Sequence, residues 1–187
     1  MKTVILNLFI ASLLLMNANS TSAQGNFVKA YMINAKGDTV RGEVKINPKK
    51  EFDHYFKITF KDEAGAQKNY KPAKIKGFGF DNKNFIAYGE DEDAMFYERL
   101  TDGAIILYKS CFLSVHMNQE MREAAYYLYR PGDKKMTDVR EDKFKKQIQE
   151  WMSGAAGFAG EYTEEKKFNV ESAIAVINKY NDWKKSN

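Results

Sequence analysis

The sequence predicts an α+β domain, with an antiparallel meander sheet or partly closed barrel of about eight strands, followed by two C-terminal helices. Three observations predict this class. Short segments rich in apolar and aromatic residues recur between turn sequences from residue 27 to about residue 130. No helix-length periodic segment separates them, which argues against a parallel α/β sheet. After Pro131 the apolar spacing changes to that of helices.

Residues 1–23 predict a secretory signal peptide that is cleaved after Ala23. Lys2 provides a positive start, and small residues precede the expected cleavage point. The apolar run between them has about 13 residues, fewer than the roughly 20 that a membrane-spanning helix needs. We therefore expect a mature chain of residues 24–187, periplasmic or secreted and soluble, with no membrane span after cleavage.

The mature chain is expected to be one domain, with a β region at residues 24–131 and a helical region at 139–185. In residues 39–47 apolar and charged residues alternate, so one set faces a core and the other faces water. Gly42 inside this strand predicts a bulge or the close approach of a backbone or an aromatic ring. The segments expected as strands are residues 26–34, 39–47, 55–61, 68–71, 76–80, 84–88, 94–100, 104–111 and 122–130.

Two amphipathic helices are expected after the strands. Apolar residues at i, i+4, i+7 and i+8, beginning at Phe144, predict a helix at about residues 140–153. The small-residue segment 153–160 is expected to be a connector. A last helix is expected from Asn169, a plausible N-cap, to Trp183. The apolar stripe of each helix is expected to dock on the sheet.

Three segments carry a resemblance to a group of small exported proteins. They are GDTVRGEV at residues 37–44, YKPAKIKGF at residues 70–78, and the closing pair Tyr180-Asn181. In these segments the chain resembles proteins of Bacteroidetes-type bacteria that combine a signal peptide, a GDTxxGxV hairpin, aromatic strands and C-terminal helices. The resemblance implies an exported location and brings no catalytic residue with it.

Composition and spacing argue against several chemistries. The net charge is only +4 and the basic residues are scattered, so no nucleic-acid partner is expected. His54, His116 and Cys111 lie in separate segments without zinc-site spacing, so neither a metal nor another cofactor is expected. Cys111, the single cysteine, is expected to be a buried apolar residue. No nucleophile elbow or triad pattern occurs, and no catalytic residue is predicted.

One dense acidic cluster is formed by Glu90, Asp91, Glu92 and Asp93. Carboxylates in a loop could hold calcium, but the cluster lacks the alternate spacing that places side chains around one ion. A solvated loop between two strands is the favoured interpretation, and calcium binding stays open.

Aromatic residues, 14% of the chain, are the one feature above background. Exposed rings on a sheet face can grip ligands, and the candidate ligand-binding residues are Tyr126, Tyr127, Tyr129, Phe78 and Phe80. The competing interpretation is that the docked helices cover these rings.

The sequence thus predicts an exported, non-catalytic binding or interaction module for a protein, a peptide or a glycan. One alternative is a lipocalin-like carrier of a small molecule, if the strands close into a barrel. Another is an envelope hydrolase based on carboxylates, which requires a cleft with two convergent acids of perturbed pKa.

Overall fold

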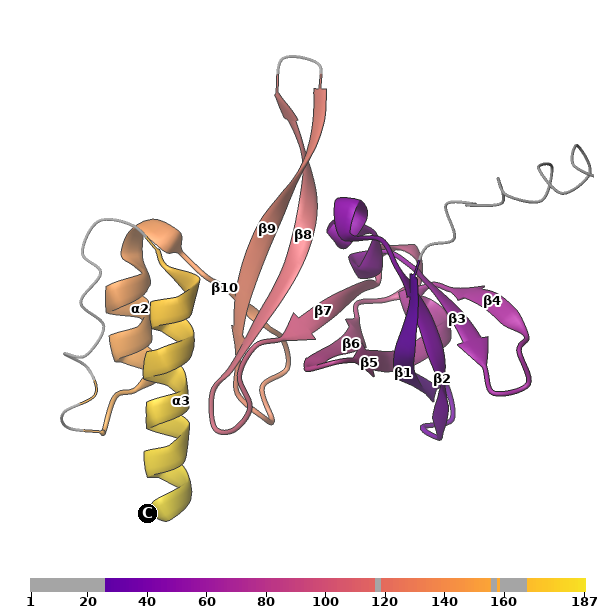
Figure 1. Ribbon diagram of the computed structural model, residues 1–187. Helices are drawn as coiled ribbons and strands as arrows, with labels where there is room; N and C mark the ends of the chain where they lie inside the picture. Colours follow the sequence, from indigo (N-terminus) through magenta and orange to yellow (C-terminus); the bar gives the residue numbers. More distant parts are fainter. Residues whose placement is uncertain (1–25, 117–118, 156–157, 159–167) are drawn as a thin grey trace, which may run out of the picture.

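The computed structural model describes residues 26–116, 119–155, 158 and 168–187 (Figure 1). The expected signal peptide and much of the expected connector at 153–160 lie outside the described residues. Within the described part of the chain, no helix is long and apolar enough to cross a membrane.

The described residues form an α+β fold: one antiparallel sheet of ten strands, with two α-helices toward the C-terminal end. The strands are β1 (Asn26–Asn34), β2 (Thr39–Ile46), β3 (Ile58–Asp62), β4 (Gln67–Tyr70), β5 (Ile75–Phe80), β6 (Lys83–Tyr88), β7 (Met95–Arg99), β8 (Ile106–His116), β9 (Gln119–Tyr129) and β10 (Thr137–Asp138). The helices are the 3-10 helices η1 (Pro48–Tyr55), η2 (Pro72–Lys74), η3 (Asp91–Asp93) and η4 (Glu141–Lys143), and the α-helices α2 (Phe144–Trp151) and α3 (Val170–Ser186).

Two meanders join along β1 and β5. The strand order is β10-β9-β8-β7-β6-β5-β1-β2-β3-β4, so β1 lies between β2 and β5. The described strands form an open sheet with β4 and β10 at its edges, so of the two expected forms the antiparallel sheet is confirmed and the partly closed barrel is wrong. The count of about eight strands was also too low. The β10 strand has two residues and is too short to show a period-two pattern.

Residues 48–55 fold as η1 and pack on one face of the sheet. Pro48 occupies the first turn, and the Asn47 side chain accepts a hydrogen bond from the Lys49 backbone N–H at 3.1 Å. The strand expected from residue 55 therefore begins only at Ile58, because Tyr55 ends this 3-10 helix.

Directly paired residues of antiparallel strands point to the same face of a sheet, and the ladder registers therefore define two faces. The core face carries a cluster that η1 covers through Tyr55; its buried strand residues are Met32, Val44, Ile58, Phe60, Ile75, Phe78, Phe80, Phe85, Phe96 and Cys111. Gly42 is needed here, because a Cβ at this position would lie 2.8 Å from the Phe60 ring. This close approach confirms the expectation for Gly42.

The two α-helices pack together on the sheet at the base of β8 and β9 (Figure 1). This second cluster has as its buried members Ile105, Leu107, Leu128, Phe144, Ile148, Met152, Ala155, Ala173, Val176, Ile177 and Tyr180. The expected docking of the helical stripes is confirmed. The buried Asn181 side chain adds a polar link to the sheet: it accepts from the Ile105 N–H at 2.9 Å and donates to the Ile105 carbonyl at 2.8 Å.

Candidate functional site

A row of tyrosines lies on the sheet face opposite the core face. Tyr31 is paired with Gly79, Tyr97 with Ile86, and Tyr127 with Tyr108. Following these registers from strand to strand places six tyrosines on one side. We call this surface the tyrosine face; its members are Tyr31, Tyr88, Tyr97, Tyr108, Tyr127 and Tyr129.

Tyr97 is the centre of the tyrosine face. Its ring centroid lies 5.6 Å from that of Tyr88 and 5.2 Å from that of Tyr127, with interplanar angles of 79° and 70°. These are edge-to-face contacts, the geometry that the charge distribution of aromatic rings favours. The rings therefore hold one another in fixed orientations, all half-buried.

Small residues in β5 make room for the row to continue to β1. A Cβ at Gly79 would lie 2.5 Å from the Tyr31 ring, so glycine is required beneath this ring. The Tyr31 hydroxyl donates to Asn84 Oδ1 at 2.5 Å and is thereby oriented along the face.

The Tyr97 and Tyr127 hydroxyls at the centre of this face are neutral at physiological pH. Burial, with the nearby Tyr127, raises the pKa of Tyr97 to about 12. Burial and the carboxylate of Asp138 likewise raise the pKa of Tyr127. Protonated phenols donate and accept hydrogen bonds but do not act as bases. The tyrosine face is therefore suited to recognition by contact and hydrogen bonding.

The five residues expected to bind ligand lie in different places. Tyr127 and Tyr129 belong to the tyrosine face. Tyr126 lies on the other side of β9, where its ring is 5.0 Å from that of Phe168. Phe78 and Phe80 are buried in the core face, and Phe78 stacks on Phe85 with a centroid separation of 4.5 Å. The structure thus brings together two of the five.

Four members of the tyrosine face were outside that set: Tyr31, Tyr88, Tyr97 and Tyr108. Period two within β6 places Ile86 and Tyr88 on one face, and the pairing of Ile86 with Tyr97 in β7 adds Tyr97 to that face. Tyr31 joins this face through the pairing of β1 with β5, and no local sequence pattern predicts that these two strands pair.

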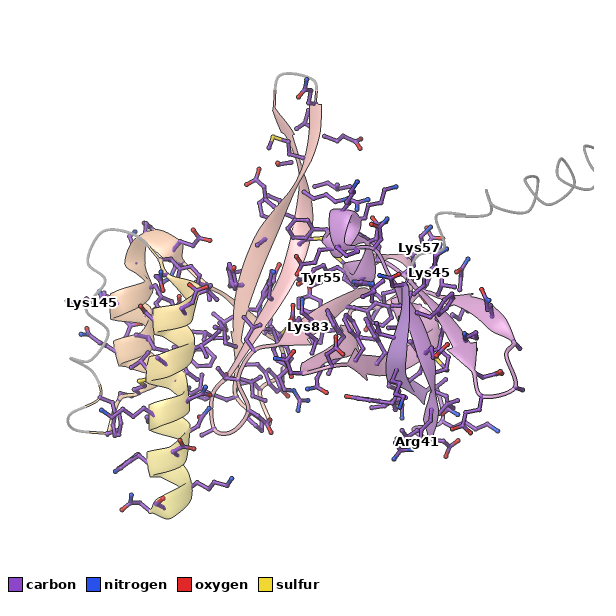
Figure 2. The ribbon with its side chains drawn as sticks, viewed as in Figure 1. Arg41, Lys45, Tyr55, Lys57, Lys83 and Lys145 are labelled. Carbon is purple, nitrogen blue, oxygen red and sulfur yellow. The ribbon has the colours of Figure 1, made fainter. Side chains whose placement is uncertain are left out.

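A polar cluster lies at the junction of η1 and the core face. The Tyr55 hydroxyl donates to the buried carboxylate of Glu98 at 2.9 Å. Lys83 Nζ is 3.1 Å from Glu51 and 3.9 Å from Glu98. Figure 2 shows Tyr55 and Lys83 in the central part of the molecule. A surface pocket of about 250 Å³ lies beside them, lined in part by His54 and Phe80.

The charges of this cluster attach η1 to the sheet. The hydrogen bond from Lys83 lowers the pKa of Glu51, which keeps this carboxylate ionised at neutral pH. A general acid requires the opposite shift. Burial raises the pKa of the Tyr55 phenol and lowers that of His54, so both side chains are neutral. The cluster therefore links η1 to the sheet by paired charges and one buried hydrogen bond.

Other residues considered for chemistry have ordinary surroundings. Cys111 is buried as expected, and burial raises the pKa of its thiol to about 11, which disfavours the nucleophilic thiolate. Glu90, Asp91, Glu92 and Asp93 are exposed around η3. Within residues 26–116, 119–155, 158 and 168–187, no three His, Cys, Asp or Glu side chains are grouped so as to hold a metal ion.

Comparison with protein-family models, with curated proteins and with solved structures finds no match to this chain.

Proposed function

We propose that the chain is an exported, non-catalytic module that binds a polypeptide partner along the tyrosine face. One observation carries the proposal: a contiguous row of half-buried tyrosines, centred on Tyr88, Tyr97 and Tyr127, on the side of the sheet opposite η1 and the α-helices. Tyrosine supplies a large contact area and a hydrogen-bonding group while immobilising only two side-chain torsions. Rings that already support one another lose little freedom when a partner binds.

The ring orientations favour a polypeptide over a glycan. A sugar ring stacks best on an aromatic ring that lies flat and open. Tyr97 instead stands nearly perpendicular to both Tyr88 and Tyr127. A surface that presents ring edges and hydroxyl groups fits the mixed apolar and amide groups of an extended chain.

The two alternative functions find less support in the geometry. A lipocalin-like carrier needs a closed barrel with an interior cavity, whereas this sheet is open and its core face is filled by phenylalanines. A hydrolase based on carboxylates needs an acid with a raised pKa. In the cluster beneath η1, Glu51 and Glu98 share Lys83, and the pKa of Glu51 is lowered.

The test is selection from a phage-displayed library of random linear peptides on the mature chain, in parallel with a glycan array. We expect peptides to be enriched and glycans not. Tyr127→Ala is expected to weaken the binding of enriched peptides about tenfold or more, because interface tyrosines often dominate binding energy. The matched control is Tyr126→Ala, one residue away on the opposite face.

Both variants are checked by circular dichroism, and affinities are measured by calorimetry. The proposal fails if no peptide is enriched, or if Tyr126→Ala weakens binding as much as Tyr127→Ala. Enrichment of glycans alone would replace the polypeptide by a carbohydrate ligand.

A further inference from the structure

The distal part of the β8–β9 hairpin exposes large apolar side chains. Among the described residues, these exposed side chains all lie here: Phe112 (45% exposed), Leu113 (54%), Val115 (68%) and Met121 (49%). Figure 1 shows this hairpin projecting beyond the other strands of the sheet. A cluster of large apolar side chains on an exposed surface is typical of an interaction site.

Both outer edges of the projecting hairpin lack a neighbouring strand among the strands described. The β8 strand pairs with β9 along its whole length, but its pairs with β7 are confined to Tyr108 and Lys109. The β9 strand pairs with β10 at Tyr127 and Leu128. The backbone of β8 from residue 112 onward can therefore accept a further strand.

The two edges differ in their protection against strand addition. The β9 edge carries Glu120, Arg122 and Glu123, and charged side chains on an edge discourage pairing with another chain. Residues 110–115 of β8, Ser-Cys-Phe-Leu-Ser-Val, contain no charge, no proline and no glycine. The β8 edge is thus the one open to pairing.

Three charged β9 residues pair with residues 112–115 of β8, and two of them, Arg122 and Glu123, are engaged within the chain; the third is Glu120, the partner of Val115. Arg122, the direct partner of Leu113 in the ladder, forms an ion pair with Asp53 and lies over the Phe56 ring. Glu123 accepts a hydrogen bond from the Ser114 hydroxyl. Residues 110–115 of β8 themselves therefore offer a partner backbone hydrogen bonds and apolar side chains, and they carry no charge.

We propose that the β8 edge pairs antiparallel with the β8 edge of a second copy of this chain, forming a two-fold symmetric dimer with one continuous sheet. A two-fold axis places a segment against itself, so self-pairing requires that the segment does not repel its own copy. Because residues 110–115 are uncharged, every antiparallel register within them avoids opposed like charges. Leu113 and Val115 would be covered on one side of the joined sheet and Phe112 on the other.

The area available sets the expected strength of this dimer. The three exposed β8 side chains, Phe112, Leu113 and Val115, offer roughly 300 Å² of apolar surface per copy, below the roughly 800 Å² per partner of a standard stable interface. We therefore expect a reversible dimer with a dissociation constant on the order of micromolar, not an obligate one.

The test is sedimentation velocity of the mature chain over a range of micromolar concentrations. We expect a monomer–dimer equilibrium whose dissociation constant Val115→Lys raises at least tenfold. The matched control is Met121→Lys, which changes another exposed apolar residue, on the charged strand of the same hairpin, and it is expected to change dimerisation by less than threefold. Both positions are exposed, and thermal melts verify that the variants fold.

A second readout separates edge pairing from packing of side chains. Amide hydrogen exchange of residues 112–115 is expected to slow at dimer-forming concentrations, while that of residues 119–123 is unchanged. A chain that stays monomeric at every concentration overturns the proposal. So does a dimer that Val115→Lys leaves intact, or one in which Met121→Lys is equally disruptive. Peptide binding at the tyrosine face is an independent measurement, because Tyr127→Ala is expected to leave dimerisation unchanged.

Discussion

The proximal and distal halves of the β8–β9 hairpin differ in burial although they belong to the same two strands. In the proximal half, Leu107 and Leu128 are completely buried at the base of the helices. In the distal half, Leu113 and Val115 are more than half exposed. The pairing between the strands is continuous from Ile106 to His116. Strand pairing thus stabilises both halves, but burial depends on what packs against them.

The difference shows that the same sequence pattern, an uninterrupted apolar run, can be buried in one part of a strand and exposed in another. Residues 105–108, Ile-Ile-Leu-Tyr, form an apolar run that is buried on both faces. Residues 112–115, Phe-Leu-Ser-Val, form a similar run whose apolar members are exposed. An apolar run without alternation is typical of a strand covered on both sides. In the distal half we propose that the cover comes from another molecule.

The largest expected difference between the two halves is in the loss of stability caused by the same leucine substitution in each. Leu107 and Leu113 lie on the same strand and on the same face, with exposed fractions of 0% and 54%. Leu107→Ala is expected to lower the free energy of unfolding by about 2–5 kcal/mol, because it leaves a cavity in a packed cluster. Leu113→Ala is expected to lower it by less than about 1 kcal/mol.

Urea denaturation at low protein concentration measures both variants as monomers. Equal losses of stability for the two variants would mean that the distal half is part of the core, and the comparison would fail.

A smaller effect is expected from the polar link that holds the proximal half to α3. Asn181→Ala removes the hydrogen bonds to the N–H and carbonyl of Ile105 and to the carbonyl of Asp102. Leaving these buried groups without partners is expected to cost about 1–3 kcal/mol. Hydrogen exchange should then accelerate at Ile105 and Leu107 and not in the distal half. The control is Asn187→Ala, which alters an exposed amide near the end of the same helix.

Local patterns predicted most of the strands and both helices, because the physical cause lies within a few residues. The turn between β1 and β2 forms because the Asn34 side chain accepts hydrogen bonds from the Gly37 and Asp38 N–H groups at 3.0 and 2.9 Å. The expected N-cap Asn169 accepts from the Ser172 N–H at 2.8 Å. Such contacts join residues only a few positions apart, so they can be inferred from the local sequence.

The arrangement of the tyrosine face could not be predicted in this way. Period two predicts that Tyr126 and Tyr127 point to opposite faces, but not which face the helices cover. Tyr31 and Tyr97 come onto one face through the β1–β5, β5–β6 and β6–β7 ladders. Pairing of β1 with β5 depends on where the chain returns after β4, and that is a property of the whole sheet.

The smallest expected effect concerns η1, which packs on the core face and holds Arg122 of the distal half through Asp53. Burial lowers the pKa of His54 below its unfolded value of 6.5, despite the hydrogen bond with the Lys45 carbonyl. The folded state therefore binds this proton less readily than the unfolded state does. The stability contributed by neutral His54 is complete above pH 6.5 and is lost as the pH falls through the folded pKa.

Urea denaturation at about pH 7.5 and about pH 5.5 measures this loss, and His54→Gln is expected to reduce it. Glutamine keeps a side chain able to donate to the Lys45 carbonyl but has no titrating ring. Glu51 does not interfere, because its pKa is lowered from 4.5 and its contribution is lost only at more acidic pH. If the wild-type chain and His54→Gln lose stability equally between these pH values, His54 is not the titrating group. The pH dependence of stability would then not arise from the packing of η1 against the middle of the hairpin.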